Sequence, residues 1–476
     1  MRAGKIELKD QRVLVVGLAR TGVATALFCA SRGAVVSATD IRSADQLGDA
    51  STQLPAAGVR LALGEPSEAI LEGQTLVVPS PGVSADAWLL QQARAKGIPV
   101  LSEIELASRF LRGRLIGITG SNGKTTTTSL TEHILRSAGF STVLAGNIGT
   151  PLVAQVAGTT EVTVTVAELS SFQLELVESF RPDIAVFLNL TPDHLDRHKT
   201  LSAYGAAKAR IFENQTPEDF AVLNSDDAAS ARYRPSRPQV YWFSRKTSVD
   251  QGASIEGGQI VFREQQGKRE GILAAGEIPL VGAHNLENVL AAAVATRLAG
   301  AEPVAIADGI RSFRGIEHRI ELVAEIEGVR YYNDSKATNV DATRKALESF
   351  PGRIVVILGG KDKNSDYTEL RDALGQKAIL ALLIGAAADK IEQQIRGSVA
   401  VERAGTLEVA VEEAFRAAHA GDIVLLAPAC ASFDQFENYE HRGRVFKDLV
   451  RRLQERLPSE PGAAPANSAN AGRQDA

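Results

Sequence analysis

The chain alternates between two kinds of segment. Short runs of β-branched and other apolar residues end at a turn that carries glycine, and a stretch rich in Ala, Leu and charged residues then follows. Apolar runs of about four to eight residues bounded by turn residues are typical of buried strands, and the longer stretches are typical of helices. The repeated order of strand, turn and helix predicts an α/β protein with parallel sheets.

The pattern falls into three sets, which we expect to be domains at residues 1–103, 104–315 and 316–456. Between 250 and 276, glycines and short alternating runs predict a β-rich excursion, and 284–300 is expected to be an alanine-rich helix. The expected strands are Val13–Gly17, Ala34–Asp40 and Thr75–Pro79 in the first set, Leu115–Thr119, Thr163–Glu168, Asp183–Leu190 and Phe220–Asn224 in the second, and Val329–Tyr332, Arg353–Leu358, Ile379–Ile384 and Asp422–Ala427 in the third. A helix is expected at 22–32, and the Pro- and Ala-rich segment 457–476 is expected to be a disordered tail.

Composition narrows the class of protein. The 476 residues are 44% apolar and 23% charged, which is enough for several cores. Lys and Arg number 52 against 57 Asp and Glu, so no basic excess is present to bind a nucleic acid backbone.

The two cysteines, Cys29 and Cys430, suit buried thiols in a reducing compartment. The N-terminus lacks the apolar core of a secretory signal, and the longest apolar stretches, such as 378–388, are shorter than the ~20 residues of a membrane helix. We therefore expect a cytoplasmic protein without membrane insertion.

The strongest chemical signal is the segment Thr119-Gly-Ser-Asn-Gly-Lys-Thr-Thr126, which follows an apolar strand and opens a helix. Binding of a polyphosphate requires converging backbone N–H groups, a helix N-terminus, a lysine for the outer phosphates and a hydroxyl for Mg²⁺. Gly120, Gly123, Lys124 and Thr125 supply these parts. The loop is two residues shorter than the general phosphate-loop form, and a simple tight turn is the alternative interpretation.

A weaker signal precedes the first expected helix. Gly17-Leu-Ala-Arg-Thr-Gly22 follows a strand, and Asp40 ends the next strand, as in a dinucleotide-binding fingerprint. Ala19 replaces the glycine that allows close approach of a pyrophosphate, which argues against NAD. A different diphosphate could bind here, or the turn could be purely structural.

Further polar residues follow later strands. Glu168 ends an alternating strand, where a carboxylate could hold Mg²⁺, and His194 lies in the loop after the next strand. Either could instead be an ordinary surface residue, and the helical stretch around Lys208 by itself favours a lysine in water. In the third set, the clusters 333–339, 359–363 and 429–439 each follow an apolar strand. Because ligands of open α/β sheets bind at the carboxyl ends of strands, these clusters suit a small substrate with carboxylates.

Taken together, these segments resemble the Mur ligases, and the resemblance runs in order from about residue 12 to about residue 450. The motifs that carry it are Thr119-Gly-Ser-Asn-Gly-Lys-Thr-Thr126, Gly146-Asn-Ile-Gly149, Glu168-Leu-Ser-Ser-Phe-Gln173, Asp193-His-Leu-Asp196, His318-Arg319, Asn333-Asp-Ser-Lys-Ala-Thr-Asn339 and Ala429-Cys-Ala-Ser-Phe-Asp-Gln-Phe436. The resemblance implies a Rossmann-like N-terminal domain, a central P-loop ATPase domain with a parallel sheet, and a Rossmann-like C-terminal domain. It also implies the addition of D-glutamate to UDP-N-acetylmuramoyl-L-alanine through an acyl phosphate, in the cytoplasmic stage of peptidoglycan precursor synthesis, by an enzyme that we expect to be a monomer.

The resemblance assigns roles to individual residues. It implies that ATP is bound by Gly120, Ser121, Asn122, Gly123, Lys124, Thr125, Thr126, Asn285, Arg319, Asp334 and Lys336. It implies that Lys124, Glu168, His194 and Lys208 are catalytic, and that Mg²⁺ is held by Thr125, Glu168, His194 and Lys208, the last as a CO₂-derived carbamate. It implies that the UDP substrate is bound by Thr21, Asp40, Arg42, Ser80, Pro81, Gly82 and Asn147, and that D-glutamate is bound by Thr338, Lys363, Ser432 and Phe433.

Several alternatives stay open from the sequence. Lys361 and Lys363 share one loop, so either could meet the amino acid. The nearest rival function is a ligase of the same plan that adds L-alanine, a diamino acid or a dipeptide, or that elongates folate with glutamate. A nucleotide-sensing scaffold without chemistry and an NAD-dependent oxidoreductase are the other rivals. Intact Lys124, Glu168, His194 and Lys208 argue against the scaffold.

Overall fold

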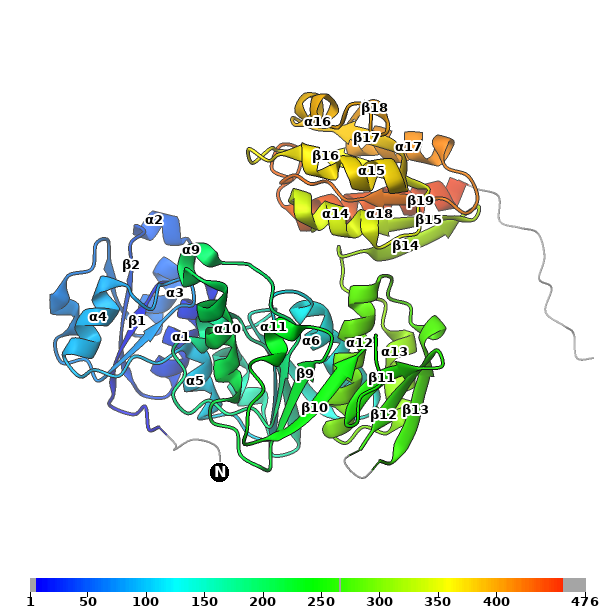
Figure 1. The fold of residues 1–476 in the computed structure, drawn as a ribbon. Helices are drawn as coiled ribbons and strands as arrows, with labels where there is room; N and C mark the ends of the chain where they lie inside the picture. The colour runs from blue at the N-terminus through cyan, green and yellow to red at the C-terminus, as the bar shows by residue number, and fades with distance from the viewer. Residues whose placement is uncertain (1–5, 265–266, 457–476) are drawn as a thin grey trace, which may run out of the picture. The chain divides into compact units, whose positions relative to one another are not determined.

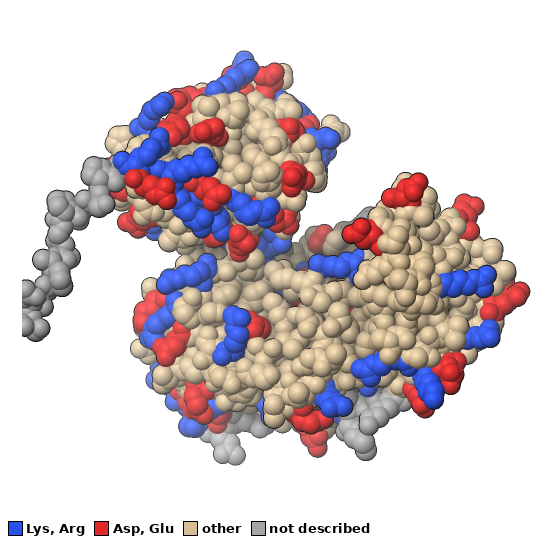
Figure 2. Space-filling view, turned by 180° about the vertical axis from the view of Figure 1, so that it is seen from behind, with Lys and Arg blue, Asp and Glu red and all other residues tan. Residues whose placement is uncertain are grey.

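The computed structural model describes residues 6–264 and 267–456, and the chain divides into one compact unit that ends at Ile316 and a second that begins at Glu317 (Figure 1). The tail predicted at 457–476 lies outside the described residues. In the described ranges, no helix is both long enough and apolar enough to span a membrane. On the face shown in Figure 2, acidic and basic side chains are interspersed, in keeping with the net charge of -5.

The first unit begins with a small parallel sheet. Its strands lie in the order β3 (Arg60–Leu63), β2 (Val35–Asp40), β1 (Arg12–Val16) and β4 (Leu76–Pro79). Alternate residues of β1 enter different cores, with Val13 and Val15 on one face and Leu14 and Val16 on the other. This is the period of two that a strand buried on both faces requires. The helices of this part are α1 (Arg20–Ser31), α2 (Ala44–Leu47), α3 (Ala50–Ala56), the 3₁₀ turn Glu68–Leu71, α4 (Trp88–Ala95) and α5 (Glu103–Ser108).

A larger sheet forms the centre of the first unit. Its strands lie in the order β13 (Arg269–Ala274), β12 (Gln259–Arg263), β11 (Gly252–Glu256), β10 (Gln239–Ser244), β9 (Phe220–Asn224), β8 (Ile184–Phe187), β5 (Arg114–Thr119), β7 (Thr163–Glu168) and β6 (Ser141–Gly146). The sequence predicts a parallel sheet here, but β12 pairs antiparallel with both β11 and β13. The β-rich excursion at 250–276 is therefore an antiparallel extension of the parallel sheet.

The helices of this central part are α6 (Lys124–Ser137), α7 (Leu152–Gln155), α8 (Ser171–Leu174), α9 (Leu195–His198), α10 (Leu201–Ala209), α11 (Ala228–Ala231), α12 (Ala283–Leu298) and α13 (Pro303–Ser312), with 3₁₀ turns at Val156–Gly158, Arg210–Phe212 and Ala275–Glu277. Helices α12 and α13 pack against α6. The face of the sheet that carries Ile116 and Ile118 of β5 shares a core with these helices.

The opposite face of the central sheet shares its core with the first sheet. Leu115 of β5 and Ala185 of β8 belong to the same apolar cluster as Val13 and Ala38 of the small sheet. Burial of apolar side chains in one continuous core stabilises the two sheets together. This shared core accounts for the finding that residues up to Ile316 form a single compact unit.

The second unit is another α/β layer structure. Its strands lie in the order β14 (Glu321–Ile326), β15 (Val329–Asn333), β19 (Ile423–Leu426), β16 (Ile354–Gly359), β17 (Ala378–Ile384) and β18 (Ala400–Gly405), and only β14 pairs antiparallel among the pairings described. The helices are α14 (Val340–Glu348), the 3₁₀ turn Tyr367–Leu370, α15 (Arg371–Lys377), α16 (Ala388–Ile395), α17 (Leu407–Ala417) and α18 (Tyr439–Arg456). Because β15, β16 and β19 are parallel neighbours, the polar segments that follow them emerge at the same edge of this sheet.

Candidate active site

The phosphate loop lies between the end of β5 at Thr119 and the start of α6 at Lys124. Gly123 adopts a left-handed conformation with φ of 83°, and a Cβ there would lie 2.2 Å from Oδ1 of Asn288 on α12. Only glycine can occupy a position that combines this backbone angle with such a close neighbour. The glycine predicted from sequence therefore lets the loop pass directly against α12.

The loop is held from its other side by the segment that follows β8. The Ser121 hydroxyl donates to the Thr191 carbonyl at 3.0 Å, and the Asn122 N–H donates to the Asn189 side chain at 2.9 Å. The contacts use Asn189 and Thr191, and β8 ends at Phe187 rather than at Leu190 as the sequence predicts. The phosphate loop is fixed before any nucleotide binds.

Two lysine side chains share one acceptor beneath this loop. Lys124 Nζ donates to the Gly120 carbonyl at 2.9 Å, and Lys208 Nζ donates to the same oxygen at 2.8 Å. Lys208 lies on α10 and is only 1% exposed. The local pattern of this helix favoured a lysine in water, and that interpretation is wrong. The structure brings together two residues that lie far apart in sequence and that the family resemblance assigns to one site.

Burial and the neighbouring ammonium change the protonation of Lys208. Burial is the larger cause and the charge of Lys124 the second, and together they lower the pKa of Lys208 to about 6, against the opposing influence of Asp193 and Glu168. Lys208 is therefore a neutral amine at pH 7. A neutral amine is nucleophilic, whereas an ammonium is not.

Glu168 lies at the end of β7, beside this pair. It is buried, and its Oε1 accepts from the Asn147 side chain at 2.9 Å. Its Oε2 is buried and has no hydrogen-bond partner among the described residues. A buried carboxylate oxygen without a partner carries a large desolvation cost, which a cation would remove. The donor chemistry at Glu168 therefore fits a divalent metal ion.

His194 is the N-cap residue just before α9 and has a left-handed backbone, with φ of 52°. Its Nε2 lies 3.5 Å from Asp193, and its ring contacts Phe172 and Tyr204 at centroid distances of 4.9 Å and 6.2 Å. The Lys208 amine lies over the Tyr204 ring, 4.4 Å from the ring centre. His194 is thus a half-exposed neighbour of the lysine pair.

Arg197, which sequence reasoning missed, joins this loop to the first sheet. Its guanidinium donates to the Pro81 carbonyl at 3.1 Å and to the Val83 carbonyl at 3.2 Å. It also pairs with Glu175 at 2.6 Å and lies 4.1 Å from the centre of the Phe172 ring. The predicted sugar-nucleotide turn, which includes Ser80 and Gly82, is thereby fixed to the loop that carries His194. No sequence signal in one chain distinguishes this arginine from a surface residue.

The other predicted sugar-nucleotide residues lie at the carboxyl ends of β1 and β2. Asp40 accepts from the Leu18 N–H at 2.6 Å and from two nitrogens of Arg42 at 2.9 Å and 2.8 Å. The hydrogen bond from Arg42 is the largest cause that lowers the pKa of Asp40 to about 2. Asp40 is therefore ionised and fixed in orientation. Thr21 lies in the first turn of α1, beside this strand edge.

The nucleotide candidates divide between the two units. Asn285, on α12, accepts from the Asn288 side chain at 3.1 Å and so lies close to the phosphate loop. Arg319, Asp334 and Lys336 lie in the second unit. Burial raises the pKa of Asp334 to about 7, although the Ile320 N–H and the charges of Arg319 and Lys336 oppose this. These three predicted residues are close neighbours of one another.

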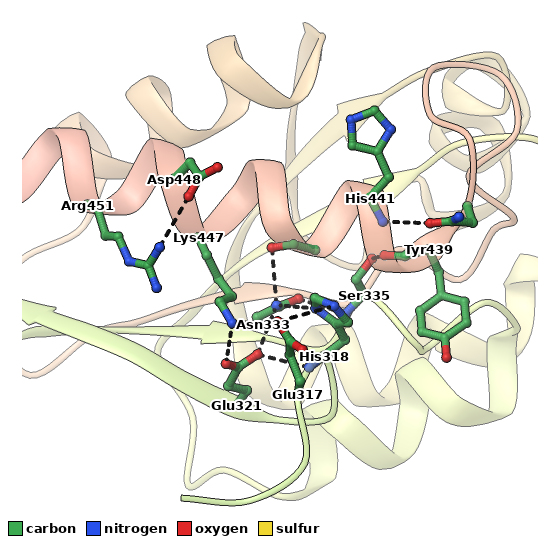
Figure 3. A network of polar contacts seen from close by, with 12 residues as sticks. Glu317, His318, Glu321, Asn333, Ser335, Tyr439, His441, Lys447, Asp448 and Arg451 are labelled. Carbon is green, nitrogen blue, oxygen red and sulfur yellow. Dashed lines mark hydrogen bonds and ion pairs between the residues drawn. The ribbon is translucent and has the colours of Figure 1, made fainter. Parts of the chain in front are cut away.

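A network of polar contacts fixes the start of the second unit (Figure 3). The Asn333 side chain donates to His318 Nδ1 at 2.9 Å, and the His318 N–H donates to Glu321 at 2.9 Å. Lys447, on α18, reaches both Glu317 and Glu321 at 2.8 Å. Burial lowers the pKa of His318, which favours the neutral ring that accepts from Asn333. The network therefore fixes the backbone on both sides of Arg319.

The predicted amino-acid residues lie on adjacent loops of the second unit. Lys361 and Ala431 exchange backbone hydrogen bonds of 2.8 Å and 3.1 Å, which join the loop after β16 to the loop after β19. Ser432 is buried beside this bridge, Phe433 is 64% exposed and Lys363 is exposed. Thr338 lies in the segment after β15. The carbonyl of Ala337, the residue just before Thr338, accepts a hydrogen bond from the Ala429 N–H.

Arg442, also missed from sequence, lies beneath these loops and is fully buried. Its guanidinium donates to the Ser335 hydroxyl at 3.0 Å, the Ser335 carbonyl at 2.9 Å and the Cys430 carbonyl at 3.2 Å. Its Nη1 finds no acceptor in the parts of the chain that the structure describes. Burial lowers the pKa of Arg442 to about 10, so the side chain stays charged at pH 7. It ties two of the predicted ligand loops together.

Across residues 6–264 and 267–456, no three side chains of His, Cys, Asp or Glu are grouped as a ready metal site. The candidates near the phosphate loop instead comprise Glu168, the hydroxyl of Thr125, and His194. Such a set suits a Mg²⁺ ion that takes some of its ligands from substrate phosphates.

Comparisons with known proteins identify the family of the chain. Three family models match: the Mur ligase MurD-like N-terminal domain at residues 11–102, the Mur ligase middle domain at 118–296, and the Mur ligase glutamate ligase domain at 318–430. The chain is 53% identical over 447 residues to the UDP-N-acetylmuramoylalanine–D-glutamate ligase of Acidobacterium capsulatum, with 94% of this chain and 97% of the relative covered. It is also 53% identical over 450 residues to the enzyme of the same name from Solibacter usitatus, with 94% and 99% covered.

Solved structures show the same fold at low sequence identity. The UDP-N-acetylmuramate-alanine ligase MurC of Thermotoga maritima matches with a TM-score of 0.57 at 18% identity, covering 93% of this chain and 99% of that one. The MurF ligase of Thermotoga maritima, in complex with ADP, matches with a TM-score of 0.56 at 18% identity, covering 94% and 96%.

The contact at Gly123 gives a first prediction. Gly123→Ala places a methyl group against Asn288 and should displace the loop, so we expect affinity for a nucleoside triphosphate to fall at least tenfold in isothermal titration calorimetry. Gly139→Ala is the matched control, because Gly139 also has a positive φ, of 87°, and an added Cβ there would meet no described atom within 4 Å. It should cost about 1 to 2 kcal/mol of stability and leave affinity unchanged. Equal affinities for the wild type and Gly123→Ala would contradict the steric account.

The protonation of Lys208 gives a second prediction. The unfolded chain keeps this lysine protonated up to about pH 10.5, whereas the folded protein releases the proton near pH 6. Between these values the unfolded state binds the extra proton, so the free energy of unfolding should rise with pH, by at most about 1.4 kcal/mol per unit. Lys208→Met should remove this rise, as measured by denaturant unfolding from pH 7 to 8.5 in CO₂-free buffer.

The control for this measurement is Lys96→Met. Lys96 pairs with Glu68 at the surface, and that pairing raises the pKa of Lys96, so it stays protonated throughout this window in both states. Its removal should leave the slope unchanged. Parallel stability curves for the wild type and Lys208→Met would rule out a neutral Lys208.

Proposed function

The chain belongs to the Mur ligase family, and we propose from this that it is an ATP-dependent ligase that joins D-glutamate to the alanine carboxyl group of UDP-N-acetylmuramoyl-L-alanine. The observation that carries the proposal is the placement of Lys124 and Lys208 on the Gly120 carbonyl, near the buried Glu168, in a chain 53% identical to ligases of that name. This places it in the synthesis of peptidoglycan precursors.

The reaction needs activation because a carboxylate is a poor electrophile. An oxygen of the alanine carboxylate attacks the γ-phosphorus of ATP, the bond to the β-phosphate oxygen breaks, and ADP leaves. The amine of D-glutamate then attacks the carbonyl carbon of the acyl phosphate. The tetrahedral intermediate expels inorganic phosphate, and the nitrogen loses a proton to give the amide. The protein must therefore neutralise phosphate charge and align two successive nucleophiles.

The phosphate loop supplies the first of these needs. The N-terminus of α6 is suited to phosphate oxygens, with Lys124, Thr125 and Thr126 at the first turn of the helix. Gly120, Ser121, Asn122 and Gly123 are proposed to line the phosphates, and the N–H groups of Ser121 and Asn122, which donate to Asn189 in this structure, would have to exchange that partner for a phosphate oxygen. Lys124 now donates to the carbonyls of Gly120 and Ser121, and we propose that it turns to the γ-phosphate when ATP binds. Asn285, Arg319, Asp334 and Lys336 are proposed to hold the rest of the nucleotide.

The metal would be held by Thr125, Glu168, His194 and a carbamate on Lys208. When bound there, Mg²⁺ would reduce the repulsion between the phosphates and the entering carboxylate. The orphaned Oε2 of Glu168 supports a cation at this position. The lowered pKa of Lys208 supports the carbamate, because a neutral amine adds to CO₂ with release of one proton. The adduct would replace a potential ammonium by carboxylate oxygens, which suit Mg²⁺.

The sugar-nucleotide substrate is proposed to bind at the edge of the first sheet. The ionised Asp40 and the Arg42 beside it, together with Thr21, lie where the uridine diphosphate would bind. The turn of Ser80, Pro81 and Gly82 is held by Arg197, and Asn147 is held by Glu168. These fixed groups would orient the muramoyl part of the substrate.

The amino acid is proposed to bind to the second unit. Lys363 is an exposed cation suited to a carboxylate of D-glutamate, Thr338 and Ser432 offer hydroxyls, and Phe433 offers an apolar wall. Because Lys361 is tied through its backbone to Ala431, we propose Lys363 rather than Lys361 as the carboxylate ligand. We also propose that the enzyme works in the cytoplasm as a monomer.

The proposed substrate is tested by release of inorganic phosphate from ATP and UDP-N-acetylmuramoyl-L-alanine in the presence of different amino acids. D-Glutamate should support turnover, because the second unit offers a cation and hydroxyls to a dicarboxylate. L-Glutamate, glycine and L-alanine should give at least tenfold less at equal concentration. Turnover with L-alanine or glycine equal to that with D-glutamate would exclude the proposed specificity.

The carbamate is tested by Lys208→Ala. This variant should lose nearly all turnover, because the proposed metal ligand is absent. A short carboxylic acid such as formate should restore part of the rate by placing a carboxylate in the vacated space, and the phosphate-release assay reports both effects. Lys199→Ala, just before the helix that carries Lys208 and outside the proposed set, is the control. Rates like the wild type in Lys208→Ala without added acid would refute the role.

A further inference from the structure

Tyr367 lies beneath the two loops that are proposed to bind the amino acid. Its hydroxyl oxygen is 2.8 Å from Oδ1 of Asp362 and 2.9 Å from Sγ of Cys430. Asp362 lies between Lys361 and Lys363 in the loop after β16, and Cys430 lies two residues before Ser432 in the loop after β19. A single buried hydroxyl thus contacts both walls of the proposed pocket.

The hydrogen bonds have a defined direction. An ionised carboxylate can only accept, so the Tyr367 O–H donates to Asp362, and the Cys430 S–H then donates to the Tyr367 oxygen. Burial raises the pKa of the Cys430 thiol to about 11 and also raises the pKa of Tyr367, so both donors keep their protons at pH 7. Lys390 completes the chain by pairing with the other oxygen of Asp362 at 2.7 Å.

Asp362 in turn shapes the loop that carries Lys363. Its Oδ1 also accepts from the Ser365 N–H at 3.1 Å, which closes a turn around Lys363 and Asn364. Asn364 has a positive φ of 62°, a conformation that needs support from its surroundings. The position of Lys363 therefore depends on where the Asp362 carboxylate is held.

We propose that Tyr367 is a positioning residue for amino-acid binding: its hydroxyl holds the Lys363 loop in register with the Ser432 loop. This inference rests on the proposed function, since it assigns these two loops to D-glutamate. It adds a residue that touches neither substrate nor nucleotide. Asp362 keeps Lys390 and Ser365 when the hydroxyl is removed, and Lys361 keeps its backbone hydrogen bonds to Ala431, so the loop should still fold but the segment around Lys363 should be held less firmly in register with the Ser432 loop.

Tyr367→Phe tests the proposal, because it removes one oxygen and leaves the buried ring in place. We expect the KM for D-glutamate to rise at least about fivefold, which corresponds to ~1 kcal/mol, the usual contribution of a buried hydrogen bond. The kcat should stay within about twofold of the wild type, and the KM for ATP should not change. Steady-state phosphate release with each substrate varied in turn gives these values.

Tyr331→Phe is the matched control. Tyr331 is a fully buried tyrosine of β15 in the same unit, and its hydroxyl has no hydrogen-bond partner within the described part of the chain. Its loss should leave every kinetic constant unchanged. An unchanged KM for D-glutamate in Tyr367→Phe, or a parallel loss of kcat and of ATP affinity, would overturn the positioning role.

A second pair of variants tests the contact between Cys430 and Tyr367. Cys430→Ser keeps a donor to Tyr367 and should retain a KM for D-glutamate near that of the wild type, whereas Cys430→Ala should raise this KM as Tyr367→Phe does. Equal KM values for the two variants would count against a role for the hydrogen bond between Cys430 and Tyr367. The wild type separates the two proposals: no turnover with D-glutamate refutes the proposed function, whereas normal turnover with no effect of Tyr367→Phe refutes only the positioning role.

Discussion

The carbonyl oxygen of Gly120 accepts hydrogen bonds from two lysine amines, and this shared acceptor governs the candidate site of the first unit. Burial disfavours a charge on Lys208 and the nearby charge of Lys124 adds repulsion, so the pKa of Lys208 falls to about 6. The phosphate loop and α10 are joined at a point where electrostatics leaves one amine available for chemistry.

The second unit also contains a buried basic side chain, but there the side chain stays charged. Arg442 is as deeply buried as Lys208, but a guanidinium does not lose its proton near pH 7, so its charge must be met by backbone and hydroxyl oxygens. Those oxygens belong to the segments after β15 and β19. The negative charge of Asp434 also favours the charged form of Arg442. The buried guanidinium thus serves to join the segments after β15 and β19.

The sequence predicted the fold class and most of the interior strands, because runs such as IVVILG of β16 are apolar and fully buried. It missed β3, β6, β14 and β18, which are all edge strands with only one paired neighbour. Exposed polar side chains interrupt the apolar pattern in some of them, as in AVERAG of β18. It also missed β10, in the interior of the central sheet. The resemblance supplied the candidate residues, but the local pattern alone favoured a solvent-facing Lys208, because a lysine on a helix normally lies in water, whereas here it is buried. Arg197, Tyr367 and Arg442 act through contacts distant in sequence, so local pattern gave no reason to single them out.

In the second unit, β19 is inserted between β15 and β16, which are both made much earlier. During synthesis, the pair β14 and β15 and the set β16 to β18 are therefore made before β19, the strand that joins them. Until β19 has been made, β15 and β16 each have an unpaired edge that could pair with another chain. Arg442 follows later still, on α18. The loops proposed to bind the amino acid are thus completed only after β19 and the start of α18 have been made. A polypeptide terminated just before Arg442 would carry the six described strands of this sheet without the arginine that joins the segments after β15 and β19.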